Sequence, residues 1–402
     1  MGQHLAVCTP CGKKVDENKN PTDDPQLTSS QANQVNNSQI GNQQTPDLQN
    51  QNVKNSLNQS TQNNNNITPG NNLSTLKSTS VHNSIAQTPN VNPVALKVSQ
   101  AIKNNNSIIA SNINFQIVNK FIAKCHNDTI SCLIELNSGN IATGSYDTTI
   151  KIWDLNNFNQ PIKSLTSAGR VICLLEFEPG ILLCGTDKNE IEKWNINGST
   201  NEPLFIFKEH LLWVNCLTKC NDNFFASGSN DSDIRIWNYS NQIPYNVLAD
   251  HEEAVLTLIT LKDGKLCSGG MDKTIKIWDW EKGTCIKNLP GHTSWVKCVF
   301  QLENGFIVSG SDDKTIKIWN NNYECIDTLN GHKKSIRIIC QISDNLIVSG
   351  SFDKTIKIWD INKRLCVQTL EEKSKIICLL LYSNGELISV NDERCVKIWK
   401  NK

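Results

Sequence analysis

The sequence predicts an all-β protein in which one structural unit is copied seven times. Seven tryptophans recur at intervals of 40 to 43 residues: Trp153, Trp194, Trp237, Trp278, Trp319, Trp359 and Trp399. The chain between them is a series of short apolar runs separated by turn residues, with no room for a regular helix. A fixed period of this length indicates a repeat architecture.

The unit that ends at Trp319 shows its internal plan most clearly. Its apolar runs occupy residues 285–292, 295–302, 306–311 and 315–319, with Glu-Asn-Gly and Asp-Asp-Lys among the turn residues that punctuate them. The runs are rich in Val and Ile, and Ile316-Lys317-Ile318 alternates with a period of two. Short β-branched runs bounded by turn residues are typical of strands, so each unit is predicted to form four strands.

Composition divides the chain into residues 1–112 and 113–402. The first part contains no Phe, Tyr or Trp, and about a third of it is Asn or Gln, whereas every aromatic side chain lies at or after Phe115. A segment without large apolar side chains cannot bury enough surface to offset the entropy of ordering. We therefore expect residues 1–112 to be a disordered tail and residues 113–402 to form the folded domain.

Charge and cysteine placement argue against several classes of protein. The chain has 39 basic and 39 acidic residues, so it lacks the basic excess that captures nucleic acid. No apolar run reaches the ~18 residues of a membrane span. Two sets of cysteines share a repeat position, namely Cys132, Cys173, Cys216, Cys298 and Cys378, and Cys285, Cys325 and Cys366. Residues one repeat apart cannot pair, so we predict small buried side chains in a reducing compartment.

These repeats resemble the WD-repeat family, the β-propellers that include G-protein β subunits. The resemblance covers residues 115–402 and depends on Gly-His pairs such as Gly291-His292, on Trp-Asp pairs such as Trp278-Asp279, and on the seven tryptophans in register. It implies a seven-bladed β-propeller of four-stranded blades. The last blade lacks an outer strand because the chain stops just past Trp399, so we expect residues 115–123 to pair there and close the ring.

The resemblance also implies a buried quartet of His, Ser or Thr, Asp and Trp within a blade. Five repeats carry it: His126, Thr143, Asp147 and Trp153; His210, Ser227, Asp231 and Trp237; His251, Ser268, Asp272 and Trp278; His292, Ser309, Asp313 and Trp319; and His332, Ser349, Asp353 and Trp359. In such a quartet Asp accepts from the imidazole, which accepts from the hydroxyl, which accepts from the indole. No histidine outside the tail then remains for catalysis or metal binding.

Two repeats depart from the pattern, and we expect neighbouring blades to hold them in place. The three polar positions carry Ser167, Cys184 and Lys188 in one, and Glu372, Ser389 and Glu393 in the other. The first also has Glu192 where other repeats have Lys or Arg, so it is the predicted place for a local specialisation. Phosphate-loop, His-Glu-x-x-His and Gly-x-Ser-x-Gly motifs are absent, and we predict no catalytic site, metal or cofactor.

Related propellers bind partners on the face that carries the loop after Gly-His and the turn preceding the quartet Asp. The corresponding residues here are Tyr146, Arg170, Trp213, Met271, Trp295, Asp312, Phe352 and Lys375. Trp, Tyr and Arg dominate interface energies. Trp213 and Trp295 lie outside the Trp position of the repeat, so we predict that they bind partners; the alternative is that they only cover blade edges.

The first residues predict a lipid anchor. Gly2 is available for N-myristoylation once Met1 is removed, although Ala6 stands where Ser or Thr is usual, and Cys8 and Cys11 are close enough for palmitoylation. A single acyl chain binds a membrane only reversibly, so the second signal matters. The alternative is an ordinary disordered start.

We predict a non-catalytic scaffold in the cytoplasm, with membrane association if the N-terminus is acylated. Its expected partners are proteins or peptides, and no nucleic acid or small-molecule substrate is expected. The alternative is a substrate-recognition subunit of a ubiquitin ligase or another multiprotein complex. Against the ligase, the tail has no F-box module, and Asn156 and Asn362 occupy the Arg position of a Trp-Asp-x-Arg adaptor motif.

Overall fold

A computed structural model of the chain describes residues 115–122, 125–155, 157 and 160–401. The tail predicted for residues 1–112, with its lipidation sites Gly2, Cys8 and Cys11, lies outside these described residues. The same is true of the unit Lys13–Asn90, one of the two units into which the chain divides.

The described residues form seven sheets of four antiparallel strands each. The first blade contains β2 (Ile130–Glu135), β3 (Ile141–Ser145), β4 (Thr149–Trp153) and β5 (Lys163–Thr166). The second contains β6 (Val171–Glu178), β7 (Ile181–Thr186), β8 (Glu190–Asn195) and β9 (Phe205–Lys208). The third contains β10 (Val214–Lys219), β11 (Phe224–Ser229), β12 (Ile234–Asn238) and β13 (Ile243–Leu248). The fourth contains β14 (Val255–Thr260), β15 (Leu266–Gly270), β16 (Ile275–Asp279) and β17 (Thr284–Leu289).

The remaining blades follow the same plan. The fifth contains β18 (Val296–Gln301), β19 (Ile307–Ser311), β20 (Ile316–Trp319) and β21 (Cys325–Leu329). The sixth contains β22 (Ile336–Ser343), β23 (Leu346–Ser351), β24 (Thr355–Asp360) and β25 (Leu365–Glu371). The seventh contains β26 (Ile376–Leu381), β27 (Leu387–Asn391), β28 (Val396–Asn401) and β1 (Phe115–Ile122).

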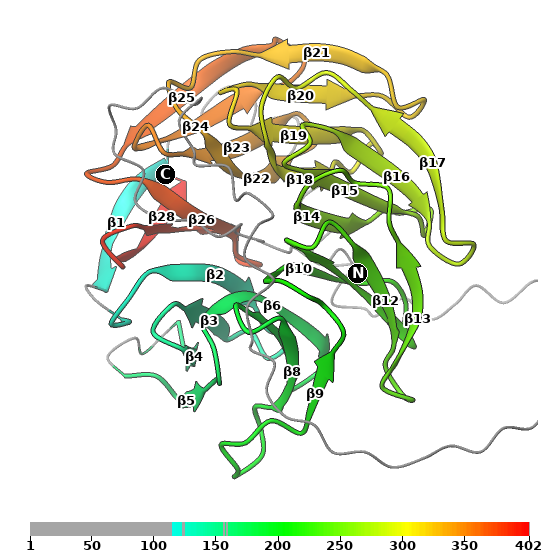
Figure 1. Cartoon of the computed structure of the whole chain (residues 1–402). Helices are drawn as coiled ribbons and strands as arrows, with labels where there is room; N and C mark the ends of the chain where they lie inside the picture. Colours follow the sequence, from blue (N-terminus) through cyan, green and yellow to red (C-terminus); the bar gives the residue numbers. More distant parts are fainter. Residues whose placement is uncertain (1–114, 123–124, 156, 158–159, 402) are drawn as a thin grey trace, which may run out of the picture. The chain divides into compact units, whose positions relative to one another are not determined.

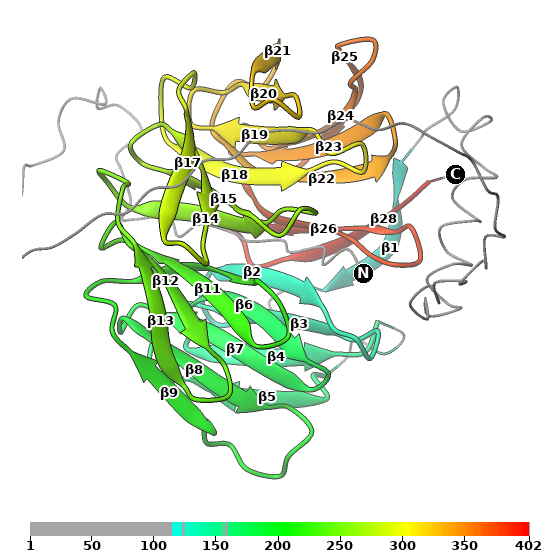
Figure 2. The same ribbon diagram turned by 90° about the vertical axis from the view of Figure 1, so that its right-hand side faces the viewer.

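The blades stand around a common axis with their first strands innermost (Figure 1). Each inner strand contacts the inner strand of the next blade, from β2 through β6, β10, β14, β18, β22 and β26 and back to β2. In the view turned by 90° the outer strands β5, β9 and β13 lie at the margin of the ring (Figure 2). The predicted seven-bladed propeller of four-stranded blades is therefore confirmed.

Strand β1 closes the ring, as the sequence predicted. It pairs antiparallel with β28, from Phe115 opposite Asn401 to Ile122 opposite Val396, and so supplies the outer strand of the last blade. The backbone of Phe115 also exchanges two hydrogen bonds with the Gln368 side chain on β25, at 3.2 and 3.1 Å. One segment thus ties the last two blades together.

Close approach between blades depends on a glycine at the end of the second strand. A Cβ atom at Gly310 would lie 2.7 Å from Ile336 of the next inner strand and 2.8 Å from Cys298 of its own blade. Six blades have glycine here: Gly144, Gly185, Gly228, Gly269, Gly310 and Gly350. The missing side chain lets neighbouring sheets pack face to face, which the tryptophan period alone does not reveal.

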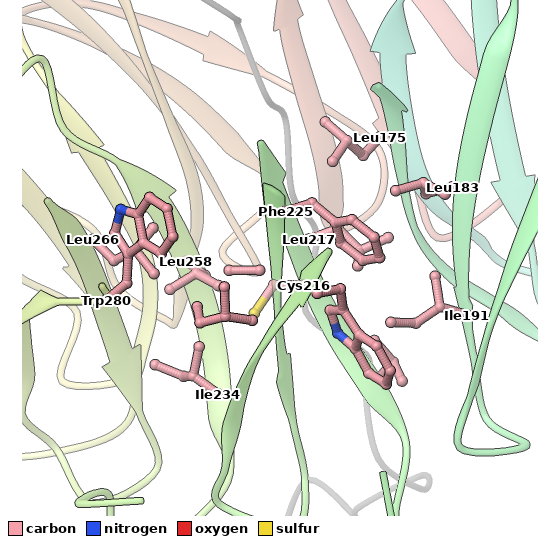
Figure 3. Close-up of a cluster of buried hydrophobic side chains, with 14 of the residues drawn as sticks. Leu175, Leu183, Ile191, Cys216, Leu217, Phe225, Ile234, Leu258, Leu266 and Trp280 are labelled. Carbon is pink, nitrogen blue, oxygen red and sulfur yellow. The ribbon is translucent and has the colours of Figure 1, made fainter. Parts of the chain in front are cut away.

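The core lies between blades rather than at the centre of the ring. In one cluster Phe225 of the third blade lies beside Leu183 and Ile191 of the second, and Leu258 and Leu266 of the fourth blade lie on the other side of the third (Figure 3). Such contacts bury both faces of each sheet, so interior strands such as β15 and β19 are buried at every position. This explains why those strands read as continuous apolar and small residues rather than as an alternating pattern.

The cysteine prediction holds only in part. Cys132, Cys173, Cys216, Cys298 and Cys378 are buried as predicted, and the first four are free thiols. Cys285, Cys325 and Cys366 were expected to be buried but are partly or fully exposed. They lie at outer strands, where one face of the sheet meets solvent.

Candidate binding face

Five blades contain a continuous hydrogen-bonded quartet at the positions that the sequence singled out. In the fifth blade His292 Nδ1 lies 2.7 Å from Asp313, His292 Nε2 lies 2.7 Å from Ser309 Oγ, and Trp319 Nε1 donates to that hydroxyl at 2.9 Å. The same three contacts recur in the quartets of His126, His210, His251 and His332.

Burial and hydrogen bonding shift the pKa values of His126 and of the quartet aspartates. Burial lowers the pKa of His126, so the neutral ring donates from Nδ1 to Asp147 and accepts from Thr143 at Nε2. Burial raises the pKa of Asp231, but the hydrogen bond from His210 outweighs it and the pKa falls to about 2. The Asp231 carboxylate therefore stays ionised and the His126 imidazole stays neutral near pH 7. All five described histidines are committed to these structural contacts.

The second blade replaces its quartet with a carboxylate. Glu192 is 1% exposed, and its Oε2 accepts from Trp194 Nε1 at 3.0 Å. Its Oε1 accepts from the backbone N–H of Ala168 at 2.9 Å, and the Ser167 hydroxyl also bonds to it. Neighbouring blades were expected to hold this blade, but it also has its own polar contact, because Glu192 accepts from Trp194 two residues later and so supplies the acceptor that serine supplies elsewhere.

Glu192 makes a pH-dependent contribution to stability. Burial raises its pKa above 4.5, so the folded protein binds a proton more tightly than the unfolded chain does. The contribution is fully present below pH 4.5 and is lost as pH rises through the folded pKa. We expect Glu192→Gln, which stays neutral, to gain stability relative to the native protein in urea denaturation over the range of pH above 4.5. A constant difference between the two proteins across that range would contradict this assignment.

The seventh blade keeps half of the pattern. Trp399 Nε1 donates to Ser389 Oγ at 2.9 Å, as in the complete quartets. Glu372, in place of the histidine, forms an ion pair with Lys397, and its side chain is fully buried. A charged pair inside the blade thus substitutes for the imidazole and aspartate, and again the blade supplies its own polar contact.

The two rows of residues predicted for the binding face lie side by side in every blade. A backbone N–H from the turn after the second strand donates to a carbonyl just before the inner strand at 2.9–3.2 Å. The pairs are Tyr146 with Thr129, Asp187 with Arg170, Asn230 with Trp213, Met271 with Ala254, Asp312 with Trp295, Phe352 with Ser335, and Asp392 with Lys375. The predicted residues therefore form one ring on one face of the propeller.

Trp213 and Trp295 are only partly buried. Neither belongs to the six hydrophobic clusters of the described residues, whereas the repeat tryptophans Trp237 and Trp319 do. Sequence reasoning missed their neighbours Leu211 and Leu212, which are 74% and 49% exposed beside Trp213. The signal was available, since two consecutive leucines follow a His where other repeats have polar or charged residues.

Three aromatic side chains on this face make cation–π contacts with neighbouring basic side chains. Arg170 lies 5.6 Å from the ring centroid of Tyr146, and Lys297 lies 4.3 Å from that of Trp295. Phe352 has Arg337 at 5.0 Å and Lys375 at 5.7 Å. Phe352 also packs against a core cluster, so it is less available to a partner than the sequence suggested.

The charges on this face are divided between its two sides. The loops entering the third and fourth blades carry the exposed acids Glu209, Glu252 and Glu253. The loops entering the sixth and seventh blades carry the exposed bases Lys333, Lys334 and Lys373. In the part of the chain that the structure describes, no group of acidic, His or Cys side chains is arranged to hold a metal ion. No helix there is long and apolar enough to cross a membrane.

The closed ring of blades and the buried quartets together define a β-propeller built from repeats that each contain a tryptophan. The chain belongs to the WD-repeat family: the model "WD domain, G-beta repeat" matches residues 117–154, 201–238, 242–279, 283–320 and 323–360. Each of these five segments ends one residue after the repeat tryptophan of a blade that contains a complete quartet. The segments ending at Trp194 and Trp399, whose polar contacts differ, are not among them.

Curated relatives match this chain over short stretches. A ribosome biogenesis protein WDR12 homolog of Chlamydomonas reinhardtii is 24% identical over 29% of this chain and 28% of its own length. The E3 ubiquitin-protein ligase COP1 of Arabidopsis thaliana is 25% identical over 28% of this chain and 16% of its own. The mouse (Mus musculus) kinesin-like protein KIF21B is 31% identical over 28% of this chain and 7% of its own length. The match therefore spans less than a third of each relative.

A solved structure shows the same fold. The WD40 β-propeller domain of Doa1 matches with a TM-score of 0.64 and 22% identity, over 72% of this chain and 98% of that domain. Identity at this level shows the fold and not a shared partner.

Proposed function

We propose that this protein is a non-catalytic scaffold that binds partner proteins on the face defined by Tyr146, Arg170, Trp213, Met271, Trp295, Asp312, Phe352 and Lys375. The observation that carries the proposal is the pair of tryptophans on this face that no core cluster uses. Aromatic side chains that the fold does not need, set among both charge signs, are typical of interface centres. The named relatives support a scaffold, since they share the repeat but differ in the processes that their names describe.

The proposal predicts that Trp295→Ala impairs partner binding without impairing the fold. Truncating an interface hot spot costs at least ~2 kcal/mol, which weakens binding about thirtyfold. We therefore expect partner recovery in a quantitative pull-down to collapse, while the melting temperature changes little. The matched control is Tyr245→Ala, which removes a half-exposed aromatic from the outer strand β13. Equal recovery from the two variants would overturn the assignment of the face.

A second candidate is substrate recognition within a ubiquitin ligase or another multiprotein complex. Its support is the similarity to COP1 over part of the propeller. The candidates differ in outcome: a ligase subunit should co-purify with ligase components, and its partners should accumulate when the protein is depleted. A simple scaffold would show neither effect.

Localisation is a further part of the proposal. The chain acts in the cytoplasm, and acylation of Gly2 with palmitoylation of Cys8 or Cys11 would hold it at a membrane. Only the sequence supports this tether, because these residues lie outside the described part of the chain. Membrane fractionation of a Gly2→Ala variant tests it directly.

A further inference from the structure

The loop that enters the third blade presents two exposed leucines. Leu211 is the most exposed of the large apolar side chains in the described part of the chain, at 74%, and Leu212 is 49% exposed. The residue pairs at the equivalent positions of the seven repeats are Asn127-Asp128, Ala168-Gly169, Leu211-Leu212, Glu252-Glu253, Thr293-Ser294, Lys333-Lys334 and Lys373-Ser374. The third blade is therefore the one of the seven that places large apolar side chains at this point of the face.

The backbone of this loop is held by side chains of its own blade and of the preceding one. The N–H of Leu211 donates to Asp231 at 2.9 Å, and its carbonyl accepts from the side chain of Asn189 in the second blade at 2.8 Å. The carbonyl of Leu212 accepts from the Ser229 hydroxyl at 3.0 Å. A loop fixed in this way loses little freedom on binding, so its exposed side chains form a preorganised surface.

Two further apolar side chains lie on the same face. Trp213 follows directly after the leucines, Met271 lies in the turn after β15 of the fourth blade, and both are partly buried. Single exposed apolar side chains are ordinary on a protein surface, but a group of them on one face marks an interaction site. Methionine adapts its shape to its neighbours, so this region suits apolar side chains of a partner.

The loop of the next blade is acidic. Glu252 and Glu253 occupy in the fourth blade the positions that Leu211 and Leu212 occupy in the third, and both are exposed. Glu209, two residues before Leu211, is a third exposed acid. The carboxylates of these three residues form no ion pair or hydrogen bond with the described residues, so they are available to a partner.

Most of the basic side chains of this region are already paired. Lys208 pairs with Glu190, Arg170 with Asp187, Arg235 with Asp233, and Lys276 with Asp250. The turns of the second and fourth blades add two exposed lysines, Lys188 and Lys273. Three free carboxylates therefore stand against two free amines, and the two consecutive acids give the fourth blade an excess of negative charge beside the leucines.

We propose that residues 211–213 anchor an amphipathic segment of a partner protein, whose apolar side chains pack on Leu211 and Leu212 and whose basic side chains meet Glu252 and Glu253. This inference rests on the proposed function and deepens it, because the loop lies on the same face. Apolar contact supplies most of the affinity, and the complementary charges set the orientation. The consecutive acids repel an anionic lipid surface, so a basic amphipathic segment fits this region better than a membrane does.

The test uses the full-length protein and three synthetic peptide libraries that share the same degenerate flanks. The first library fixes two leucines and two lysines at its centre, the second replaces the leucines with serines, and the third replaces the lysines with glutamates. We expect the first library to bind at least about tenfold more tightly than either of the others. Equal binding of all three libraries, or no binding of any, would overturn the proposal.

The decisive variant combines Leu211→Ser with Leu212→Ser. We expect it to abolish the preference for leucine over serine while the melting temperature stays unchanged, because both side chains are exposed in the native protein. The control Leu365→Ser removes a 46% exposed leucine from the start of β25, at the opposite end of the strands, and should keep the preference. Loss of the preference in both variants would show general apolar attraction and contradict the proposal. So would a native protein that binds no library and self-associates through this loop, which size-exclusion chromatography of the double variant would reveal as a smaller species.

A second double variant, Glu252→Gln with Glu253→Gln, tests the role of the acids. We expect it to lose the preference for lysine over glutamate and to keep the preference for leucine over serine, because only the charges have been removed. An unchanged preference for lysine would contradict the assignment of basic partner side chains to this loop.

The two proposals fail in different ways. If Trp295→Ala abolishes partner recovery while the double leucine variant binds every library as the native protein does, the face is a binding site but Leu211 and Leu212 anchor nothing. If Trp295→Ala has no effect and the leucine preference still depends on Leu211 and Leu212, the anchor stands and the wider partner face is wrong.

Discussion

Trp319→Ala is expected to lower the free energy of unfolding by about 3–5 kcal/mol, the usual range for truncating a buried tryptophan. Trp319 is 2% exposed and packs in a cluster with Leu289, Ile307 and other apolar side chains. The substitution opens a cavity and removes the indole N–H that donates to Ser309. Urea denaturation measures the loss, and the fifth blade should be the first to lose protection from hydrogen exchange.

Trp295→Ala is the matched comparison for this prediction. It removes another tryptophan side chain, twenty-four residues earlier in the chain. Trp295 contributes to no core cluster, so the effect of this substitution on stability should be small. If both variants lose similar stability, the distinction between repeat tryptophans and face tryptophans fails, and the proposed binding face loses its main support.

Deleting Phe115–Ile122 from the full-length chain is expected to open the ring. The deletion exposes the whole edge of β28, removes the buried Phe115 and breaks its two hydrogen bonds with Gln368. An unpaired strand edge invites association with other chains. We expect most of the protein to be recovered as aggregate, and the soluble remainder to melt over a broad range at lower temperature.

The control for the strand deletion is removal of eight residues within the Asn-rich tail, for example residues 63–70. That variant should elute from size-exclusion chromatography and melt like the native protein. A strand-deleted protein that also elutes and melts like the native protein would contradict closure by β1.

The features that sequence analysis predicted are those that repeat. The period of the tryptophans, the quartet of His292, Ser309, Asp313 and Trp319, and the closing strand all follow from one pattern seen several times. Each copy checks the others, so local ambiguity in any one blade does not matter.

Some of the features that it missed occur in a single blade. Glu192 was recognised as unusual, but its role depends on a carboxylate reaching Trp194 and Ala168 together, which a one-dimensional pattern does not show. Arg337 was not singled out, because the sequence shows its charge but not its burial. Side chains on the outer strands were predicted to be more buried than they are. Cys325, for example, is exposed because one face of an outer strand meets solvent.

Cross-linking mass spectrometry of the full-length protein, purified with its bound partners, tests the central claim most directly. Lysines lie at both ends of the strands: Lys333, Lys334, Lys373 and Lys375 on the proposed binding face, and Lys262 and Lys265 in a turn at the opposite end. We expect intermolecular cross-links to form at the first set and to disappear with Trp295→Ala. Cross-links concentrated at Lys262 and Lys265, and unchanged by that substitution, would show that partners bind the other side of the propeller.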